Sequence, residues 1–185
     1  MQCAYGCLEG FIAAKNSHSV TVLAVFDNEE TGSLTKQGAD STFLDEVLKR
    51  ISLASGKDEE GHYRAVSSSF MVSADNAHAV HPNHPEKADP INRPMINKGI
   101  VIKFNAAQHY TTDAVSCAVY RDLCESNDIP VQVFTNRSDT KGGSTLGNVS
   151  NAHVSLNTLD IGLAQLAMHS CYETVGARDT KHLVD

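Results

Sequence analysis

The sequence predicts an α/β protein, specifically a three-layer α/β/α sandwich with a mostly parallel mixed sheet. Short apolar runs that could be buried strands alternate with longer segments whose apolar residues recur at helical spacing. Polar residues with catalytic or ligand chemistry directly follow two of these runs, and α/β sheets bind ligands beyond the carboxyl ends of their strands. The length of 185 residues allows one such domain with a substantial core.

The first half of the chain is expected to contain two helices and two strands. Residues 1–16 read as an amphipathic helix whose apolar side holds Ala4, Cys7, Leu8, Phe11 and Ile12. Residues 20–27 are expected to form a strand, residues 41–55 a helix and residues 68–74 a strand. Residues 57–61 form a charged turn in this scheme. Residues 76–98, rich in Pro, His and Asn, are expected to form a long loop, and a loop of this length is usually functional or disordered.

The second half continues the alternation. Strands are predicted over residues 99–104, 130–135 and 155–161. A helix over residues 111–126 is expected to turn its apolar residues inward, namely Ala114, Val115, Ala118, Val119 and Leu123. A glycine-rich loop at residues 141–147 leads into a short helix that ends near residue 153, and residues 169–182 are expected to form a closing helix.

Composition narrows the classes of function. The net charge of −7 argues against nucleic acids and anionic membranes as partners. No apolar run approaches a membrane span, and no signal peptide is visible. The five cysteines are odd in number and lack Cys-x-x-Cys spacing, so they are expected to be reduced packing residues of a cytoplasmic protein.

Two adjacent carboxylates are the most informative feature of the chain. Glu29 and Glu30 follow the apolar run at residues 22–26, where an α/β sheet places its site. Adjacent side chains on extended backbone diverge, so one carboxylate can bind a metal while the other handles the proton of a water molecule. A solvated acidic loop is the alternative for such a pair.

Three further segments carry unusual chemistry. Asp75 ends the apolar run at residues 69–74 and has three histidines close behind, and His169 follows another apolar segment. Together with Glu30, these two residues are good ligands for a borderline metal such as zinc. Lys103 ends a third apolar run, where a cation is costly unless it is paired.

These motifs, in their order along the chain, resemble the aspartyl aminopeptidase family of co-catalytic zinc metallopeptidases. The resemblance rests on residues 27–30 with Gly32 and Ser33, residues 37–39, residues 73–75 with 78–83, residues 143–145 with Gly147, and residues 168–170. It implies that Glu30, Asp75 and His169 bind metal and that Glu29 is the general base. It also implies that His78 and Lys103 contact substrate, with Lys103 recognising an N-terminal Asp or Glu. Tyr110 is a further candidate for substrate binding, because its phenol can donate a proton to a developing oxyanion. His78 as supporting loop residue and Tyr110 as packing residue remain alternatives.

The resemblance further implies two zinc ions in a complete enzyme, with cobalt or manganese as alternatives, and a homo-oligomer that acts on peptides. Family members also carry an upstream His-x-Asp motif, a metal-bridging Asp and a dimerisation domain, and none of these occurs in this sequence. Residues 1–185 therefore resemble the C-terminal portion of the catalytic domain, a fragment that lacks two metal ligands. We expect the isolated chain to be inactive. The alternative is an inactive binding or assembly module derived from the same fold.

Two other motifs have weaker functional interpretations. His81 and His84 have the spacing of a metal-binding pair, but Pro82 excludes a helix there, so a loop role is favoured. The run at residues 141–145 precedes a helix as a phosphate-binding loop does, yet it lacks the order of a P-loop. By resemblance this loop lines the active site. Asp139 is a candidate to cap or brace it.

Overall fold

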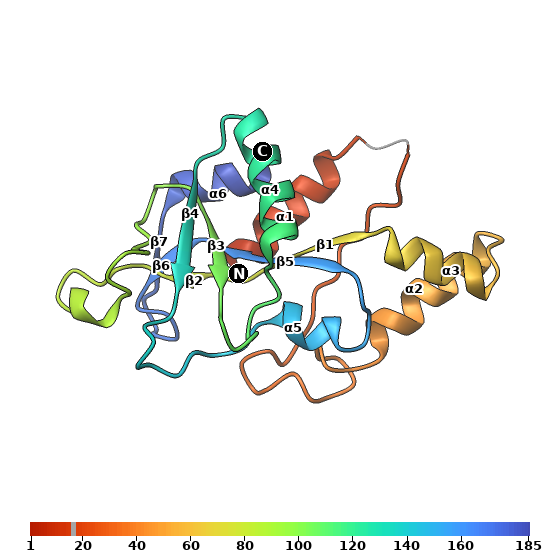
Figure 1. Cartoon of the computed structure of the whole chain (residues 1–185), viewed down its shortest axis with the longest axis horizontal. Helices are drawn as coiled ribbons and strands as arrows, with labels where there is room; N and C mark the ends of the chain where they lie inside the picture. The colour runs from red at the N-terminus through yellow and green to blue at the C-terminus, as the bar shows by residue number, and fades with distance from the viewer. Residues whose placement is uncertain (16–17) are drawn as a thin grey trace.

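A four-stranded sheet in the order β1-β5-β3-β4 forms the centre of the computed structural model, which describes residues 1–15 and 18–185 (Figure 1). β1 (Phe70–Ala74) runs parallel to β5 (Asn157–Gly162), and β3 (Ile100–Phe104) runs parallel to β4 (Val131–Thr135). The two pairs meet where β3 runs antiparallel to β5. The predicted α/β fold with a mostly parallel mixed sheet is therefore confirmed.

A smaller sheet, in the order β2-β6-β7, continues from the end of the large one. β2 (Ala77–His78) follows β1 in the chain, β6 (Ala164–Leu166) follows β5, and β7 (Thr174–Val175) lies at the edge. Gly162 lies where β5 passes into β6. A Cβ atom there would lie 2.0 Å from the carbonyl oxygen of Asp75, so only glycine permits this close approach.

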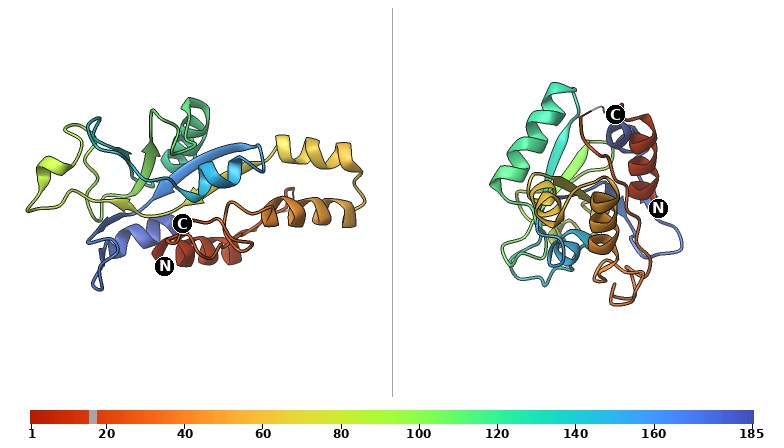
Figure 2. Two further views of the ribbon diagram at one scale, coloured as in Figure 1. Left: turned by 90° about the horizontal axis from the view of Figure 1, so that it is seen from below. Right: turned by 90° about the vertical axis from the view of Figure 1, so that its right-hand side faces the viewer.

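Helices lie on both faces of the large sheet (Figure 2). α1 (Gln2–Ala13), α4 (Ala114–Ser126) and α6 (Ala177–Val184) contribute to the main core on one face. α5 (Leu146–Asn151) packs on the other face. Its Gly147 lies against Asp160 of β5. Leu159 and Ile161, on either side of Asp160, point into the main core, so Asp160 points to the opposite face. None of the described helices is long and apolar enough to cross a membrane.

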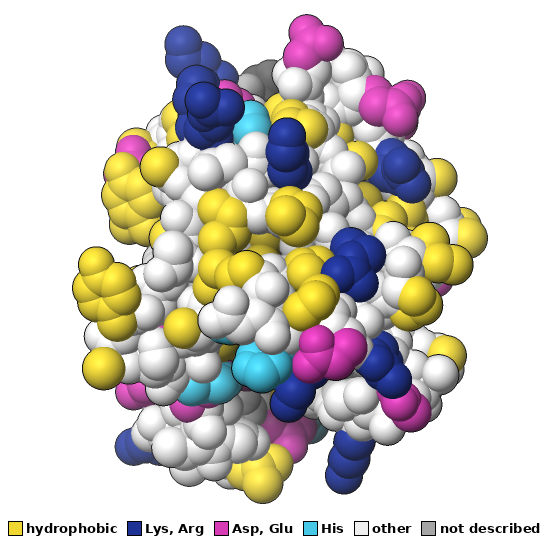
Figure 3. Space-filling model, turned by 90° about the vertical axis from the view of Figure 1, so that its left-hand side faces the viewer, with side chains coloured by type: hydrophobic (Ala, Val, Ile, Leu, Met, Phe, Trp, Pro, Cys, Tyr) yellow, Lys and Arg dark blue, Asp and Glu magenta, His cyan; other side chains and the backbone are white. Residues whose placement is uncertain are grey.

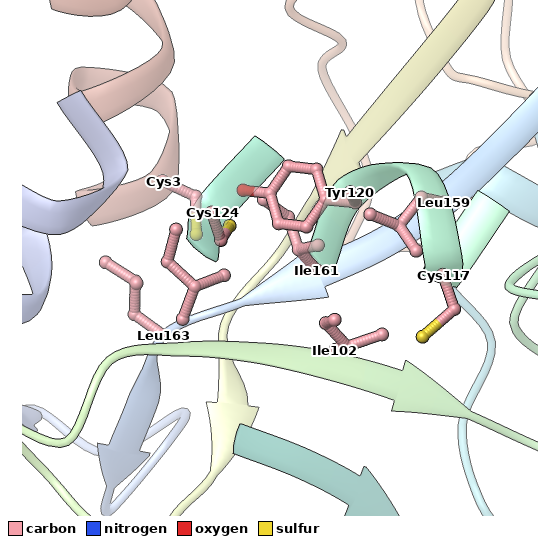
Figure 4. Packing of buried hydrophobic residues seen from close by; sticks show 9 residues of the cluster. Cys3, Ile102, Cys117, Tyr120, Cys124, Leu159, Ile161 and Leu163 are labelled. Carbon is pink, nitrogen blue, oxygen red and sulfur yellow. The ribbon is translucent and has the colours of Figure 1, made fainter. Parts of the chain in front are cut away.

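The main core joins α1 and α4 to the centre of the sheet (Figure 4). Each aliphatic side chain in its centre contributes about 1.5–3 kcal/mol through burial. The opposite side of β3 carries Val101 and Lys103, which are equally buried. The core residues are Cys3, Ile100, Ile102, Cys117, Tyr120, Cys124, Leu159, Ile161 and Leu163.

A helical hairpin projects from the body of the molecule (Figure 2). It consists of α2 (Phe43–Ala54), which matches the predicted helix, and α3 (Glu59–Ser67). The prediction of a charged turn at residues 57–61 was wrong, because α3 begins within this segment, at Glu59. Asp58 accepts a hydrogen bond from the Gly61 amide at 2.7 Å and caps this helix, and Glu59 and Glu60 favour its first turn.

The predicted strand at residues 20–27 was also wrong. These residues have no strand assignment in the described chain, and Val20 and Val25 are 77% and 67% exposed. A β-branched run forms a strand only when a neighbour completes its hydrogen-bond ladder. Here the backbone amide of Asp27 donates instead to the carbonyl oxygen of Gln37 at 3.1 Å.

Two helices turn a different face inward than the sequence predicted. α4 buries Ser116, Cys117, Tyr120 and Cys124, whereas the predicted inward residues include exposed Val115, Val119 and Leu123. α1 buries Cys3 and Gly6, and exposes Leu8, Phe11 and Ile12. Gly6 explains the orientation of α1: a Cβ atom there would lie 2.7 Å from Leu183 of α6, so the two helices pack closely at this residue.

Two boundaries differ from prediction as well. The closing helix begins at Ala177 rather than residue 169, because residues 169–176 form a turn and strand β7. The long loop at residues 76–98 is mostly irregular, as expected, but contains β2 and the short helix η1 (Pro85–Lys87).

Candidate functional site

A cavity of about 520 Å³ contains every residue predicted to act in catalysis, metal binding or substrate binding. Its size suits a small ligand. The seven predicted residues come from five separate segments of the chain, so the fold, rather than local sequence, brings them to one place. They are Glu29, Glu30, Asp75, His78, Lys103, Tyr110 and His169.

A tight turn positions the two adjacent glutamates. Asn28 has a left-handed backbone (φ 62°), and its carbonyl oxygen accepts a hydrogen bond from the Ser33 amide at 2.9 Å. The Gly32 amide donates to the carbonyl oxygen of Glu29 at 3.0 Å. The position of Glu29 and Glu30 therefore depends on turn chemistry, and not on the strand end from which it was predicted.

Glu30 and His169 are in contact across the cavity. The Glu30 Oε2 atom lies 3.3 Å from His169 Nδ1. His169 has a left-handed backbone (φ 69°), which is uncommon for a residue other than glycine, and its amide donates to Glu173 Oε1 at 2.7 Å. Such strained backbone is found preferentially at functional sites.

Asp75 and Lys103 form an ion pair on the floor of the cavity. Lys103 Nζ lies 3.1 Å from Asp75 Oδ2 and 5.4 Å from the centre of the Tyr110 ring. Lys103 is only 2% exposed. β1 runs parallel to β5 and β3 runs antiparallel to it. The strand that carries Lys103 therefore runs in the opposite direction to β1, which ends just before Asp75. The counter-charge that the sequence required for Lys103 is thus a residue of the chain itself.

Burial and neighbouring charges shift the pKa values of three cavity residues. Desolvation raises the pKa of Glu29, and the negative charges of Asp75 and Glu30 add to this effect. Desolvation lowers the pKa of His78, as does the positive charge of Lys103. Desolvation, with help from Asp75 and Asp160, raises the pKa of Tyr110 to about 12. Tyr110 therefore stays protonated at neutral pH and can donate a hydrogen bond.

Asn76 is a polar hub that sequence reasoning missed. Its side-chain amide donates to Gln165 Oε1 at 2.6 Å and to Gln2 Oε1 at 3.1 Å. Its side-chain oxygen accepts from Cys3 Sγ at 2.9 Å, and its carbonyl oxygen from Lys103 Nζ at 3.3 Å. Asn76 thus ties the first turn of α1 to the cavity floor. Its position beside Asp75 was the available sequence signal.

Asp160 is a second missed residue, because its place inside strand β5 reads as core. It is 1% exposed, and its carboxylate accepts hydrogen bonds from the amide and hydroxyl of Thr111 at 2.6 and 2.7 Å. Its other oxygen accepts from the Thr145 hydroxyl at 2.8 Å. Asp160 therefore joins the loop that carries Tyr110 to the glycine-rich loop that lines the cavity.

The rim of the cavity is formed by two charged loops. Figure 3 shows histidine side chains next to acidic and basic side chains on one face of the molecule. His81 and His84 lie in the first, with ring centres 5.4 Å apart, and His84 is 3.3 Å from Glu86, in keeping with the predicted loop role. In the second, Asp139 accepts from Arg137 at 2.8 and 2.6 Å. The glycine-rich residues 141–145 line the cavity as expected.

The donor types at the cavity fit a zinc ion. Carboxylate and imidazole groups are suitable ligands for borderline metals, and Glu30 and His169 already face each other. Among the described residues, however, no three His, Cys, Asp or Glu side chains form a ready metal-binding group. The third predicted ligand, Asp75, is bound by Lys103 instead.

Comparisons with known proteins identify the family to which this fold belongs. The family model "Aminopeptidase I zinc metalloprotease (M18)" matches residues 1–185. A relative from Clostridium acetobutylicum, "Probable M18 family aminopeptidase 2", is 53% identical over 97% of this chain and 41% of its own length. The chain therefore belongs to the M18 family and spans about two fifths of that relative.

Solved structures of the family superimpose closely. The structure titled "Cryo-EM structure of the Ape4 and Nbr1 complex" has a TM-score of 0.91 and 40% identity over 98% of this chain and 35% of that chain. The S. cerevisiae mApe1 dodecamer has a TM-score of 0.85 and 29% identity over 99% of this chain and 42% of that chain.

Proposed function

We propose that this chain supplies the catalytic cavity of a metal-dependent aminopeptidase that releases N-terminal Asp or Glu from peptides. The observation that carries the proposal is the meeting, in one cavity, of a carboxylate–imidazole pair, a second carboxylate and a buried ammonium group. Membership of the M18 family supports it.

In this proposal Glu30, Asp75 and His169 hold zinc, and a complete enzyme holds two ions. Cobalt and manganese accept the same donors. A bound zinc ion polarises the substrate carbonyl and makes water a stronger nucleophile.

The remaining cavity residues do the proton transfer and binding. Glu29 accepts the proton of the attacking water, and its raised pKa favours later transfer to the leaving amine. The Tyr110 phenol donates a hydrogen bond to the developing oxyanion. His78 contacts the substrate, and Lys103 recognises its acidic side chain.

Segments beyond this chain complete the site in this proposal. Because the chain corresponds to 41% of its Clostridium relative, we expect the isolated chain to lack peptidase activity. Val115, Val119 and Leu123 of α4 are exposed, and such an apolar face suits assembly with another protein. This observation favours the second candidate function, which is an inactive binding or assembly module. The mApe1 dodecamer supports a homo-oligomer for the complete enzyme.

A chimera tests the function. This chain replaces the 179 aligned residues of the Clostridium relative, and release of p-nitroaniline from Asp- and Ala-p-nitroanilide is measured. We expect chelator-sensitive cleavage of the Asp substrate with a higher kcat/KM than the Ala substrate. Glu29→Gln should reduce kcat by about 10²–10⁴. A folded chimera whose activity persists in the presence of chelator contradicts the metal dependence. A folded chimera that cleaves both substrates with equal kcat/KM contradicts the acidic specificity.

A further inference from the structure

The ion pair on the cavity floor is markedly asymmetric. The Lys103 side chain is 2% exposed, whereas the Asp75 side chain is 40% exposed. Lys103 Nζ also donates to the carbonyl oxygen of Asn76 at 3.3 Å and lies over the Tyr110 ring. The ammonium group is thus buried and depends on its partners, while the carboxylate still faces the cavity.

This geometry gives one carboxylate two competing uses. Asp75 Oδ2 is held by Lys103 at 3.1 Å, yet Asp75 is also the third ligand that the proposed metal site requires. A divalent cation that draws Asp75 away leaves the Lys103 ammonium buried without its counter-ion. A buried unpaired charge is strongly unfavourable, so the chain must then supply or bind another anion there.

We propose that Lys103 is an internal competitor of the metal for Asp75, and that metal binding frees Lys103 to bind the carboxylate of an acidic ligand. The inference rests on the proposed function. The metal and an acidic ligand then bind with positive, reciprocal coupling. Metal binding draws Asp75 away from Lys103 and so frees Lys103 for the ligand, and ligand binding draws Lys103 away from Asp75 and so frees Asp75 for the metal. Selectivity for acidic residues is then expressed only in the metal-loaded protein.

The effect of removing Lys103 on the affinity for the metal distinguishes competition from a purely supporting role. If Lys103 only orients Asp75 for the metal, its removal weakens metal binding, as the loss of a supporting residue normally does. If Lys103 competes with the metal, its removal strengthens metal binding.

The test is a titration of the chain with Zn²⁺ against a chromophoric chelator. We expect Lys103→Met to bind Zn²⁺ about tenfold more tightly than the wild type, the scale seen when metal-site neighbours are changed. Lys141→Met is the matched control, because Lys141 is an exposed lysine lining the same cavity. It removes the same charge and should change the affinity by less than about threefold. Lys103→Gln provides a second variant if the Met variant does not fold.

The double variant with Asp75→Asn identifies the carboxylate involved. In the Asp75→Asn background, Lys103→Met should no longer strengthen Zn²⁺ binding. Equal or weaker binding by Lys103→Met in the Asp75 background overturns the inference but leaves the metal site standing. Absence of Zn²⁺ binding in both proteins overturns the inference and the metal site together.

Coupling is measured with succinate, a dicarboxylate probe, by calorimetry. We expect succinate to bind the Zn²⁺-loaded wild type about tenfold more tightly than the Zn²⁺-free protein, within the usual range of coupling between two sites. Lys103→Met should lose this difference. Equal succinate affinity with and without Zn²⁺ in the wild type would refute the coupling.

Discussion

Replacing Gly147 with Ala should destabilise the protein, although helix propensity alone favours the change. Gly147 lies in α5, where Ala is better than Gly by up to about 1 kcal/mol. A Cβ atom on Gly147, however, would lie 2.5 Å from Asp160 Oδ1 and 2.8 Å from Oδ2. The carboxylate cannot withdraw without loosening its hydrogen bonds to Thr111 and Thr145.

The expected magnitude follows from these terms. Overpacking a buried site costs about 1–3 kcal/mol. A weakened hydrogen bond to a buried charge costs about 1.5–3 kcal/mol more. After the propensity gain is subtracted, we expect a loss of about 1.5–5 kcal/mol in the free energy of unfolding, which is a fall of about 1–2.5 M in the urea midpoint at a slope of about 2 kcal/mol per M.

Gly143→Ala is the matched control for the urea experiment. Gly143 lies in the glycine-rich loop just before α5, and an added Cβ there meets no atom within 4 Å. Its stability should change by less than about 1 kcal/mol, with a gain favoured by the smaller entropy of the unfolded chain. A Gly147→Ala protein as stable as Gly143→Ala would refute the structural role assigned to Asp160.

Three further predictions concern the core, the thiols and His78. Leu159→Ala, at a fully buried position, should cost about 2–5 kcal/mol by urea unfolding, whereas Val119→Ala, 53% exposed, should cost under about 1 kcal/mol; equal losses would contradict the assigned core. Cys171 is exposed, while burial raises the pKa of Cys3 to about 12. A disulfide reagent should therefore modify Cys171 first and Cys3 only on unfolding, and fast modification of Cys3 in folded Cys171→Ser would contradict this. Desolvation lowers the pKa of His78 in the fold, so the unfolded chain binds the proton first, and this contribution to stability is lost as the pH falls below the ordinary titration range of histidine. Between about pH 7.5 and about pH 5 the wild type should therefore lose more stability than His78→Gln, and parallel curves would contradict the shift.

The alternation of strands and helices was predictable because the core strands are rich in apolar residues. Ile100 to Ile102 form a continuous apolar run, whereas in β5 the apolar Leu159 and Ile161 flank Asp160, and all of these residues are buried. The face of α4 was not predictable, because its sequence carries two apolar stripes and periodicity does not reveal which one the sheet will cover. Tyr120 and its neighbouring cysteines occupy the inner stripe, and Val115 and Val119 the outer one.

The strand at residues 20–27 failed for a related reason. Its composition is that of a strand, but strand formation requires a partner, which a sequence window does not contain. Val20, Val22 and Val25 are exposed, so no neighbouring element covers these side chains.

The candidate site was predictable where chemistry is carried by adjacent residues. Glu29 with Glu30, and Asp75 behind its strand, could be identified from the chain alone. The partners could not, because Asp160 and Asn76 act through contacts between segments far apart in sequence. The pairing of Lys103 with Asp75 likewise depends on β3 running opposite to β1, which the sequence does not specify.

The central claim is that the cavity binds a catalytic metal through Glu30, Asp75 and His169. The most direct measurement is anomalous diffraction at the zinc edge from crystals of the protein grown with Zn²⁺. The account predicts a peak in the cavity about 2 Å from a carboxylate oxygen of Glu30, an imidazole nitrogen of His169 and a carboxylate oxygen of Asp75 that has left Lys103. A peak held elsewhere, or an empty cavity with Asp75 still bound to Lys103 at saturating Zn²⁺, would contradict it.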